Sequence, residues 1–437
     1  MTSLAEVWLW GTRIGAVALE PGSPVASFEY DPAFLPSGIQ LSPLHLPLVA
    51  GVHAFPALAT DAYAGLPGLF AGALPGKFAT TLVDAWLIAQ DREPNSIDAV
   101  QRLLLVGERG TGALGFRPAL SAASFTVEAR TAPLDVAALA RMVDRVQRHG
   151  RRAADGLVDE DEHAAFSQLV SVASTMRSDV PAAYVDCNLQ TGEMRAGQNV
   201  QRAGHDPCVL EFDSLEIRAD GTDGSRDTAA LRHAYAMLAR AAGIDVAETR
   251  IVKYREQRHL LKRRIDRSAH GKLHVHSFCA MDHLDPRSEQ SVEQLFSVAK
   301  RLGLDMPDVE QMYARVVFQL LAHDRAAHFD DFAFTMNRRG QWSLAPARGF
   351  SYSTVPGFDS NAARMSLAGK FSGIETVDLG DLAASVSLPR GQALRIARRV
   401  RAALERWPEF AQESALGAEW TGCVQDGLLL DLVPIGS

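Results

Sequence analysis

The sequence is poor in cysteine and has no paired-cysteine motif. Its four cysteines are scattered over 437 residues without a Cys-x-x-Cys pair. This spacing indicates neither a disulfide framework nor a cysteine zinc site. A reducing compartment fits the pattern best, so we expect a cytoplasmic protein.

Signals for secretion or membrane insertion are also lacking. Residues 1–6 carry no basic region ahead of an apolar core, so no secretory signal is visible. The longest stretch without Asp, Glu, Lys or Arg, residues 32–60, is interrupted by four prolines, Pro36, Pro43, Pro47 and Pro56. Proline at that density argues against a membrane helix, and we expect no membrane partner.

The sequence has no excess of positive charge. Its formal net charge of -8 provides no global attraction to nucleic acid. With 47% hydrophobic and 22% charged residues, the chain has a globular composition and the length of two or three domains.

Hydrophobic patterning predicts mixed secondary structure that becomes mainly helical after about residue 304. A C-cap glycine, Gly243, should end one of the helices. Strands are predicted at 7–10, 26–30, 183–187 and 208–212, a turn at 191–192, and helices at 79–90, 134–162 and 227–243.

One glycine motif resembles a nucleotide-binding loop. Gly110-Thr-Gly112-Ala-Leu-Gly115 fits G-x-G-x-x-G and follows the apolar run 103–106, the placement that a dinucleotide site would require. No helical pattern follows it, however, and Pro118 comes three residues later. We therefore favour a structural turn over a phosphate loop.

Several landmarks along the chain resemble the HipA family of bacterial toxin kinases. In order, they cover roughly residues 5 to 370 and lie at 65–75, 106–114, 234–244, 261–267, 272–274, 283–285, 293–296, 301–303 and 342–347. The resemblance also accounts for the glycine motif, because Gly110 and Gly112 fall within the second landmark.

This resemblance implies an α+β fold with a small N-terminal α/β domain and a bilobal, protein-kinase-like core. The implied parts are a HipA N-terminal domain at 1–130, a helical linker at 131–164, a kinase-like small lobe at 165–303 and a mainly helical large lobe at 304–437.

Phosphoryl transfer requires a phosphate cradle, a lysine, metal ligands and a base, and the matched positions lack them. In the small lobe, Arg177 and Ser178 stand where the family's phosphate loop has paired glycines, in a segment from Ala173 to Ala182. Side chains there would crowd the close approach of a phosphate. The activation serine of the family aligns with Thr175, for which we favour the role of a simple loop threonine.

The resemblance aligns Glu211 with the ATP-binding lysine and Arg232 with the glutamate that pairs with that lysine. A carboxylate at the lysine position would repel a triphosphate. We expect Glu211 and Arg232 to form the family's ion pair with its polarity inverted.

The large lobe shows corresponding losses. Ala326 stands at the catalytic aspartate, Asp331 at the Mg²⁺-binding asparagine and Gly349 at the second metal ligand. A lost base removes about 10²–10⁴-fold in rate, and the other losses remove most of the electrostatic stabilisation.

Two other features could carry function. Imidazoles and carboxylates cluster within nine residues and suit a divalent metal, although their spacing matches no closed motif and a solvated acidic turn is the alternative. These candidates are His323, Asp324, His328, Asp330 and Asp331. The basic run 253–267 could contact nucleic acid, but a structural role is favoured.

The sequence thus predicts a pseudokinase that acts through protein binding in a toxin-antitoxin-type complex. Family members pair with a small helix-turn-helix antitoxin, so a partner of that kind is implied, with DNA reached only through it. The alternative is a weakly active or repurposed HipA-type serine/threonine kinase or transferase. ATP and Mg²⁺ are expected as cofactors only under that alternative.

Overall fold

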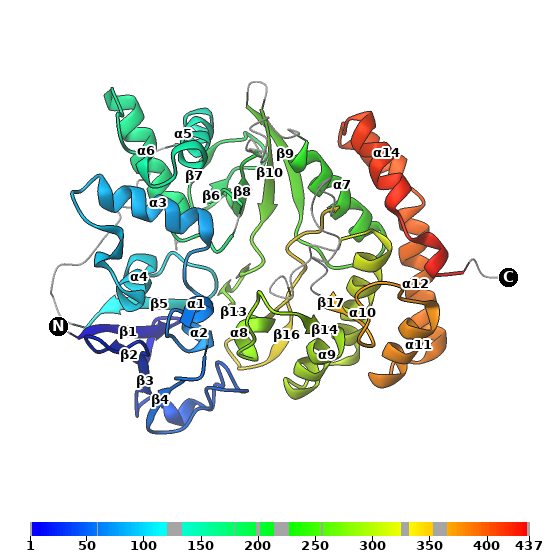
Figure 1. Ribbon diagram of the computed structural model, residues 1–437, viewed down its shortest axis with the longest axis horizontal. Coiled ribbons are helices and arrows are strands. Elements are labelled where there is room, and N and C mark those ends of the chain that lie inside the picture. Colours follow the sequence, from blue (N-terminus) through cyan, green and yellow to red (C-terminus); the bar gives the residue numbers. More distant parts are fainter. Residues whose placement is uncertain are drawn as a thin grey trace. The chain divides into compact units, whose positions relative to one another are not determined.

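The chain folds into two compact units, each built from helices and strands (Figure 1). The structure, a computed structural model, describes residues 2–58, 60–119, 133–178, 180–197, 202–213, 227–254, 257–324, 332–352 and 365–434. Unit 1 comprises Met1–Arg226, Val252–Val275 and Arg338–Gly340, and unit 2 comprises Asp227–Ile251, His276–Asn337 and Gln341–Ser437.

Unit 1 begins with a five-stranded antiparallel sheet of order β4-β3-β2-β1-β5 (blue to cyan in Figure 1). Along β1, Ala5, Val7 and Leu9 are buried and alternate with more exposed residues, the period of a strand with one face on a core. The strands are β1 Ser3–Leu9, β2 Thr12–Leu19, β3 Ser27–Tyr30, β4 Val52–Ala54 and β5 Leu114–Pro118, and the helices of this region are α1 Thr60–Tyr63, α2 Gly68–Ala71, α3 Lys77–Ile88 and α4 Ala99–Val106.

A second five-stranded sheet has the order β7-β6-β8-β10-β9 and places β8 at its centre. Its strands are β6 Ala182–Cys187, β7 Met194–Ala196, β8 Asp206–Glu211, β9 Thr249–Tyr254 and β10 Gln257–Arg263. One face of this sheet, with Val185, Cys208 and Leu210, packs into a hydrophobic core shared with two helices, α5 Val136–His149 and α6 Glu160–Ala173.

The helical stretch predicted from 134 to 162 covers α5 and the start of α6. Asp135 caps the start of α5 by accepting a hydrogen bond from the Ala138 amide, and Gly150, at a φ of 56°, ends it. Asp159 then caps α6 through the Glu162 amide. The segment predicted as a linker therefore supplies α5 to the core of unit 1.

Unit 2 is mainly helical. The long helix α10 packs against α12, and α7 packs against α12 and α13. The fully buried Trp407 lies against the Tyr235 ring. Its helices are α7 Thr228–Ala241, α8 Phe278–Met281, α9 Val292–Arg301, α10 Met306–Leu321, α11 Thr376–Ser385, α12 Arg390–Leu404, α13 Trp407–Glu413 and α14 Ala418–Gly427.

The remaining strands are short. They are β11 Arg267–Ser268, β12 Gly271–Lys272, β13 His274–Ser277, β14 Gln290–Ser291, β15 Ala333–Met336, β16 Trp342–Leu344 and β17 Met365–Ser366. They form pairs β11-β12 and β14-β17 and a three-stranded sheet of order β13-β15-β16.

The predicted C-cap glycine is confirmed. Gly243 has a φ of 74° and its amide donates to Arg240 O, while the Ile244 amide donates to Ala239 O. This pair of bonds is a Schellman motif, which satisfies the last carbonyls of α7.

Among the described residues, no helix is both long enough and apolar enough to cross a membrane.

Candidate functional site

The second sheet of unit 1 carries the positions that the sequence matched to a phosphate loop and its lysine. Glu211 ends the central strand β8, opposite Ala182 of β6 and Leu260 of β10. Leu210, the residue before Glu211, faces the hydrophobic core. Because successive side chains of a strand point to opposite faces, Glu211 lies on the other face of the sheet, together with its paired residues.

Glu211 is paired with a cation from the neighbouring strand. The Lys262 ammonium forms an ion pair with Glu211 Oε1, and their side chains are only 16% and 9% exposed. Lys262 lies opposite Val209, two residues from Glu211 along β8, so the contact is diagonal across the two strands. The face therefore keeps a lysine, but a carboxylate neutralises it.

The segment matched to the phosphate loop is docked onto the N-terminal part of unit 1. Thr175 is 3% exposed and its hydroxyl donates to Arg109 O. Met176 O accepts from the Gly76 amide at 2.9 Å, and the Arg177 guanidinium donates to Gly72 O at 2.5 Å. The role of Thr175 as a loop threonine stays a prediction.

Two backbone amides in this loop are already engaged. The Ser174 amide donates to Val170 O and the Met176 amide to Ala173 O, which continues the last turn of α6. The backbone of Ser178 lies against Gly76, where a Cβ atom would come within 2.5 Å of Ser178 O. Met176 packs into a small cluster with Ala182. Neither engaged amide is directed at a ligand, as a phosphate cradle requires.

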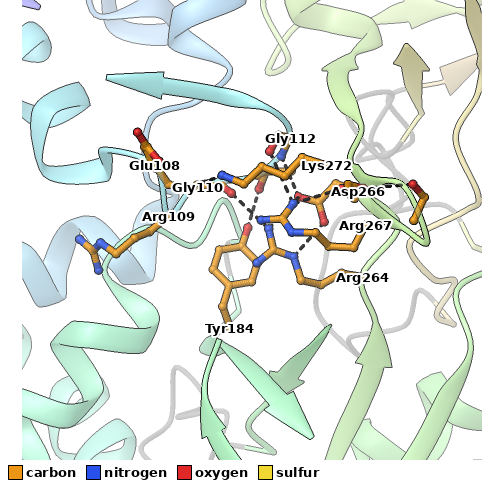
Figure 2. Close-up of polar contacts among 12 residues, drawn as sticks. Glu108, Arg109, Gly110, Gly112, Tyr184, Arg264, Asp266, Arg267 and Lys272 are labelled. Atoms are coloured by element: carbon orange, nitrogen blue, oxygen red, sulfur yellow. Dashed lines mark hydrogen bonds and ion pairs between the residues drawn. The ribbon is translucent and has the colours of Figure 1, made fainter. Parts of the chain in front are cut away.

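The glycine motif at 110–115 is a structural turn. It follows a helix, α4, rather than a strand, and leads into strand β5, the reverse of a dinucleotide-binding loop. The Gly112 amide donates to Asp266 Oδ2 at 2.7 Å, and Gly110 O accepts from Arg264 at 3.1 Å (Figure 2). These bonds use the polar groups of the turn within the protein.

A buried ionic network lies beside this turn (Figure 2). The Asp266 carboxylate accepts from Arg264 Nε and Nη2 and from Arg267 Nη1, each at 2.7–2.8 Å. The Arg264 guanidinium also stacks on the Tyr184 ring at 3.8 Å. Burial alone would raise the pKa of Asp266, but the two guanidiniums and the Gly112 amide hold it well below its usual range.

This network explains the basic run 253–267 as structural. Four of its cations are paired: Lys262 with Glu211, Arg263 with Asp206, and both Arg264 and Arg267 with Asp266. Residues 255 and 256 lie outside the described part of the chain.

Unit 2 contains the other matched positions that can be located. Arg232 lies on α7, and His323 and Asp324 follow α10. The His323 ring lies 5.3 Å from the Tyr352 ring, and Asp324 accepts from the Ser351 amide at 3.4 Å. The segment around His323 and Asp324 thus contacts the residues that follow Gly349.

Gly349 has a φ of 155° and no atom within 4 Å of where its Cβ would lie. Residues with a side chain rarely adopt that backbone conformation, so an aspartate would be strained here. The ion pair described for Glu211 is with Lys262, and its pairing with Arg232 remains a prediction.

The metal prediction cannot be placed in full. Ala326, His328, Asp330 and Asp331 lie outside the described residues. Within the parts that are described, no three His, Cys, Asp or Glu side chains are grouped to hold a metal ion. Metal binding by this segment therefore stays a prediction.

Family comparison decides the ancestry. The HipA N-terminal domain family matches residues 5–117, and the HipA-like C-terminal domain family matches residues 202–407. The chain belongs to the HipA family. The α+β, HipA-like fold expected from the sequence is confirmed.

A solved HipA structure shares the fold of this chain. The toxin–antitoxin complex of HipA, HipB and operator DNA from Shewanella oneidensis MR-1 matches with a TM-score of 0.66 at 16% identity, covering 97% of this chain and 94% of that one. The proinflammatory kinase CtkA from Helicobacter pylori matches with a TM-score of 0.35 at 10% identity, over 54% and 91% of the two chains, too low to carry a conclusion. No curated protein matches the chain.

Three contributors to this HipA-type site were not foreseen from the sequence. They are Lys262 as the partner of Glu211, Gly76 as the support of the loop, and Arg109. The Arg109 guanidinium donates to Ser171 O and Leu105 O, and burial lowers its pKa to about 10. Only the register of β8 and β10 reveals the first, because Lys262 is 51 residues away in sequence.

Proposed function

We propose that this chain is a HipA-like pseudokinase that acts through protein binding in a toxin-antitoxin-type complex in the cytoplasm. The observation that carries the proposal is the charge at Glu211. A carboxylate occupies the position that aligns with the ATP-binding lysine, and Lys262 neutralises it on the same sheet face.

Electrostatics support the loss of nucleotide binding. A triphosphate beside Glu211 would meet like charge in a nearly buried setting, where such interactions are stronger than in water. It would also compete with the carboxylate for Lys262. Breaking an ion pair that is largely buried leaves one charge uncompensated, at a cost of about 3–5 kcal/mol.

The docked loop supports the same conclusion. Two of its amides are engaged in the last turn of α6, and Arg177 anchors it to Gly72. Cradling a phosphate would require this segment to detach from Gly76 and to exchange these bonds for ligand contacts.

Metal binding is the third part of the argument. Gly349 offers no side-chain ligand at the position aligned with the second metal-binding residue. Ala326 and Asp331 are the aligned residues for the base and the asparagine. Without the ligand at the Gly349 position, one of the two groups that hold Mg²⁺ for phosphoryl transfer is missing, so neither ATP nor Mg²⁺ is proposed as a cofactor.

The proposed partner is a small helix-turn-helix protein, with DNA reached through it. Support comes from the Shewanella protein, which shares the fold over nearly the whole chain and was solved with HipB and operator DNA. A protein that acts by binding needs the fold but not the catalytic groups, so those groups can change while the fold is kept.

Two assays test this proposal. Incubation with ATP labelled in the γ-phosphate should give no incorporation above a sample without protein. The tagged chain, isolated from its own host, should co-purify with a small protein. The complex should shift the mobility of an operator fragment. The chain alone should not shift it, and neither should a preparation from which acid has removed the partner. Labelled product would instead favour the kinase or transferase alternative.

A further inference from the structure

The buried network beside the glycine turn brings three cations close to one buried carboxylate. Arg264 and Arg267 contact the Asp266 carboxylate, and Lys272 lies opposite Arg267 in the strand pair β11-β12 (Figure 2). Asp266 is 3% exposed and already accepts four hydrogen bonds, from Arg264 twice, Arg267 and Gly112.

Lys272 has an unusual place in this network. Its ammonium donates to a carbonyl, Glu108 O, at 2.7 Å. The carboxylate of Glu108 is bound to Arg117 instead. Lys272 is partly exposed, so a small molecule can reach it, and its backbone is fixed because Lys272 O accepts from Trp10 Nε1 at 2.8 Å.

Arg267 has a donor that is not used. Its side chain is 10% exposed, Nη1 contacts Asp266, and Nη2 is buried without a hydrogen-bond partner among the described residues. A buried guanidinium donor that stays unpaired destabilises the folded chain. An anion formed at Lys272, which lies opposite Arg267 across β11 and β12, could pair with this donor.

We propose that Lys272 is a modification site at which carbon dioxide forms a carbamate, and that this carbamate is held by the guanidinium of Arg267. This inference does not depend on the loss of kinase activity. It assigns a chemical role to a cluster that lies outside the phosphate loop.

The reaction needs a neutral amine. The lone pair of Lys272 Nζ attacks the carbon of CO₂, an N–C bond forms, one C=O π pair moves onto oxygen, and a proton passes from nitrogen to water. Burial, then the charges of Arg267 and Arg264, lower the pKa of Lys272 to about 8, with Glu108 and Asp266 opposing. About half of the amine is therefore neutral at pH 8.

The product would balance the network. A cation becomes an anion, so the cluster changes from three cations against Asp266 to two cations against two anions. The carbamate nitrogen keeps one hydrogen, which can still donate to Glu108 O. Its oxygens can accept from Arg267 Nη2.

Carbon-13 NMR in labelled bicarbonate tests the proposal. At pH 8 the folded chain should give one carbamate resonance that Lys272→Met abolishes and that Lys300→Met, at an exposed lysine on α9, leaves unchanged. No resonance in saturating bicarbonate, or its persistence in K272M, would overturn the proposal.

A second measurement avoids reliance on a variant. Trapping the carbamate as an alkyl ester and sequencing the peptides by mass spectrometry should locate the added mass on Lys272. Bicarbonate should also raise the melting temperature at fixed ionic strength, whereas chloride or phosphate should not. An equal rise with phosphate, without added mass, would show a bound anion and sink the carbamate.

Discussion

At the scale of single residues, the largely buried carboxylate of Glu211 is neutralised by Lys262 on the neighbouring strand. The charges of this ion pair determine which ligands can bind to that face of the sheet. Its side chains are 9% and 16% exposed, so solvent screens the interaction far less than it does in an exposed pair.

A lysine in place of Glu211 should destabilise the fold and should not restore nucleotide binding. We expect Glu211→Lys to lower the free energy of unfolding by about 3 kcal/mol or more, because two ammonium groups would then face each other in a largely buried site. Adding Lys262→Glu should recover most of that loss by reversing the pair. Urea unfolding of the two single variants and the double variant measures this coupling.

Glu193→Lys provides the matched control. Glu193 pairs with Arg195 at a more exposed site, with side chains 39% and 27% exposed, and such pairs contribute about 0–1 kcal/mol. Two results together would show that Glu211 and Lys262 are not coupled as described. Glu211→Lys and Glu193→Lys would lower the free energy of unfolding equally, and adding Lys262→Glu to Glu211→Lys would recover none of the loss.

Asp266 should make stability depend on acid. Its folded pKa is depressed below the ordinary 3.8, so its contribution is complete above about pH 4 and is lost as pH falls toward the folded value. Asp266→Asn should lose about 3–5 kcal/mol at pH 7, since two guanidiniums are left without a carboxylate, and should depend less on pH below 4.

Urea midpoints between pH 3 and pH 7 would check this. Asp206→Asn is the control, because Asp206 forms a more exposed pair with Arg263. A variant at Asp266 with unchanged midpoints would argue against the buried network.

At the scale of elements, the loop after α6 is fixed by a glycine. Gly76→Ala should lower stability by about 1–3 kcal/mol, because the new methyl group would overlap the backbone of Ser178. Hydrogen exchange should increase at residues 174–178. Gly380→Ala, on α11 with open space around the added methyl group, should be neutral or slightly stabilising. Equal melting temperatures for both variants would contradict the docking.

Elements with strong local signals could be predicted from the sequence. The strand at 183–187, the helix at 79–90 and the end of α7 at Gly243 all match the structure within a few residues. The apolar run 103–106 precedes the glycine motif, as the strand of a dinucleotide-binding unit would, but it is the end of helix α4. The sequence contains a signal for the start of that helix, because Asp98 and Gln101 form a capping box.

The site could be predicted only in part. The replacement of functional groups at Glu211, Arg177 and Gly349 is a prediction from aligned positions, and residue type alone was enough to make it. The partners could not be predicted, since Lys262 and Gly76 reach the site through strand register and tertiary packing. Single-sequence patterns carry no information on such long-range contacts.

At the scale of the whole molecule, the HipA fold is kept, whereas we propose that the kinase chemistry is lost. Two HipA domain families match the chain, while the carboxylate of Glu211 and the docked loop oppose a triphosphate. If the chain is the pseudokinase that we propose, ATP does not bind its folded state. Its melting temperature should then not change with ATP, because a ligand stabilises a protein only by binding its folded state.

Calorimetric titration of Mg-ATP into the purified chain is the most direct test of this claim. We predict no saturable heat of binding at ATP concentrations up to about 1 mM, the limit of weak association. Saturable binding at micromolar concentrations would contradict the account, because it would require a site in which Glu211 does not repel the phosphates.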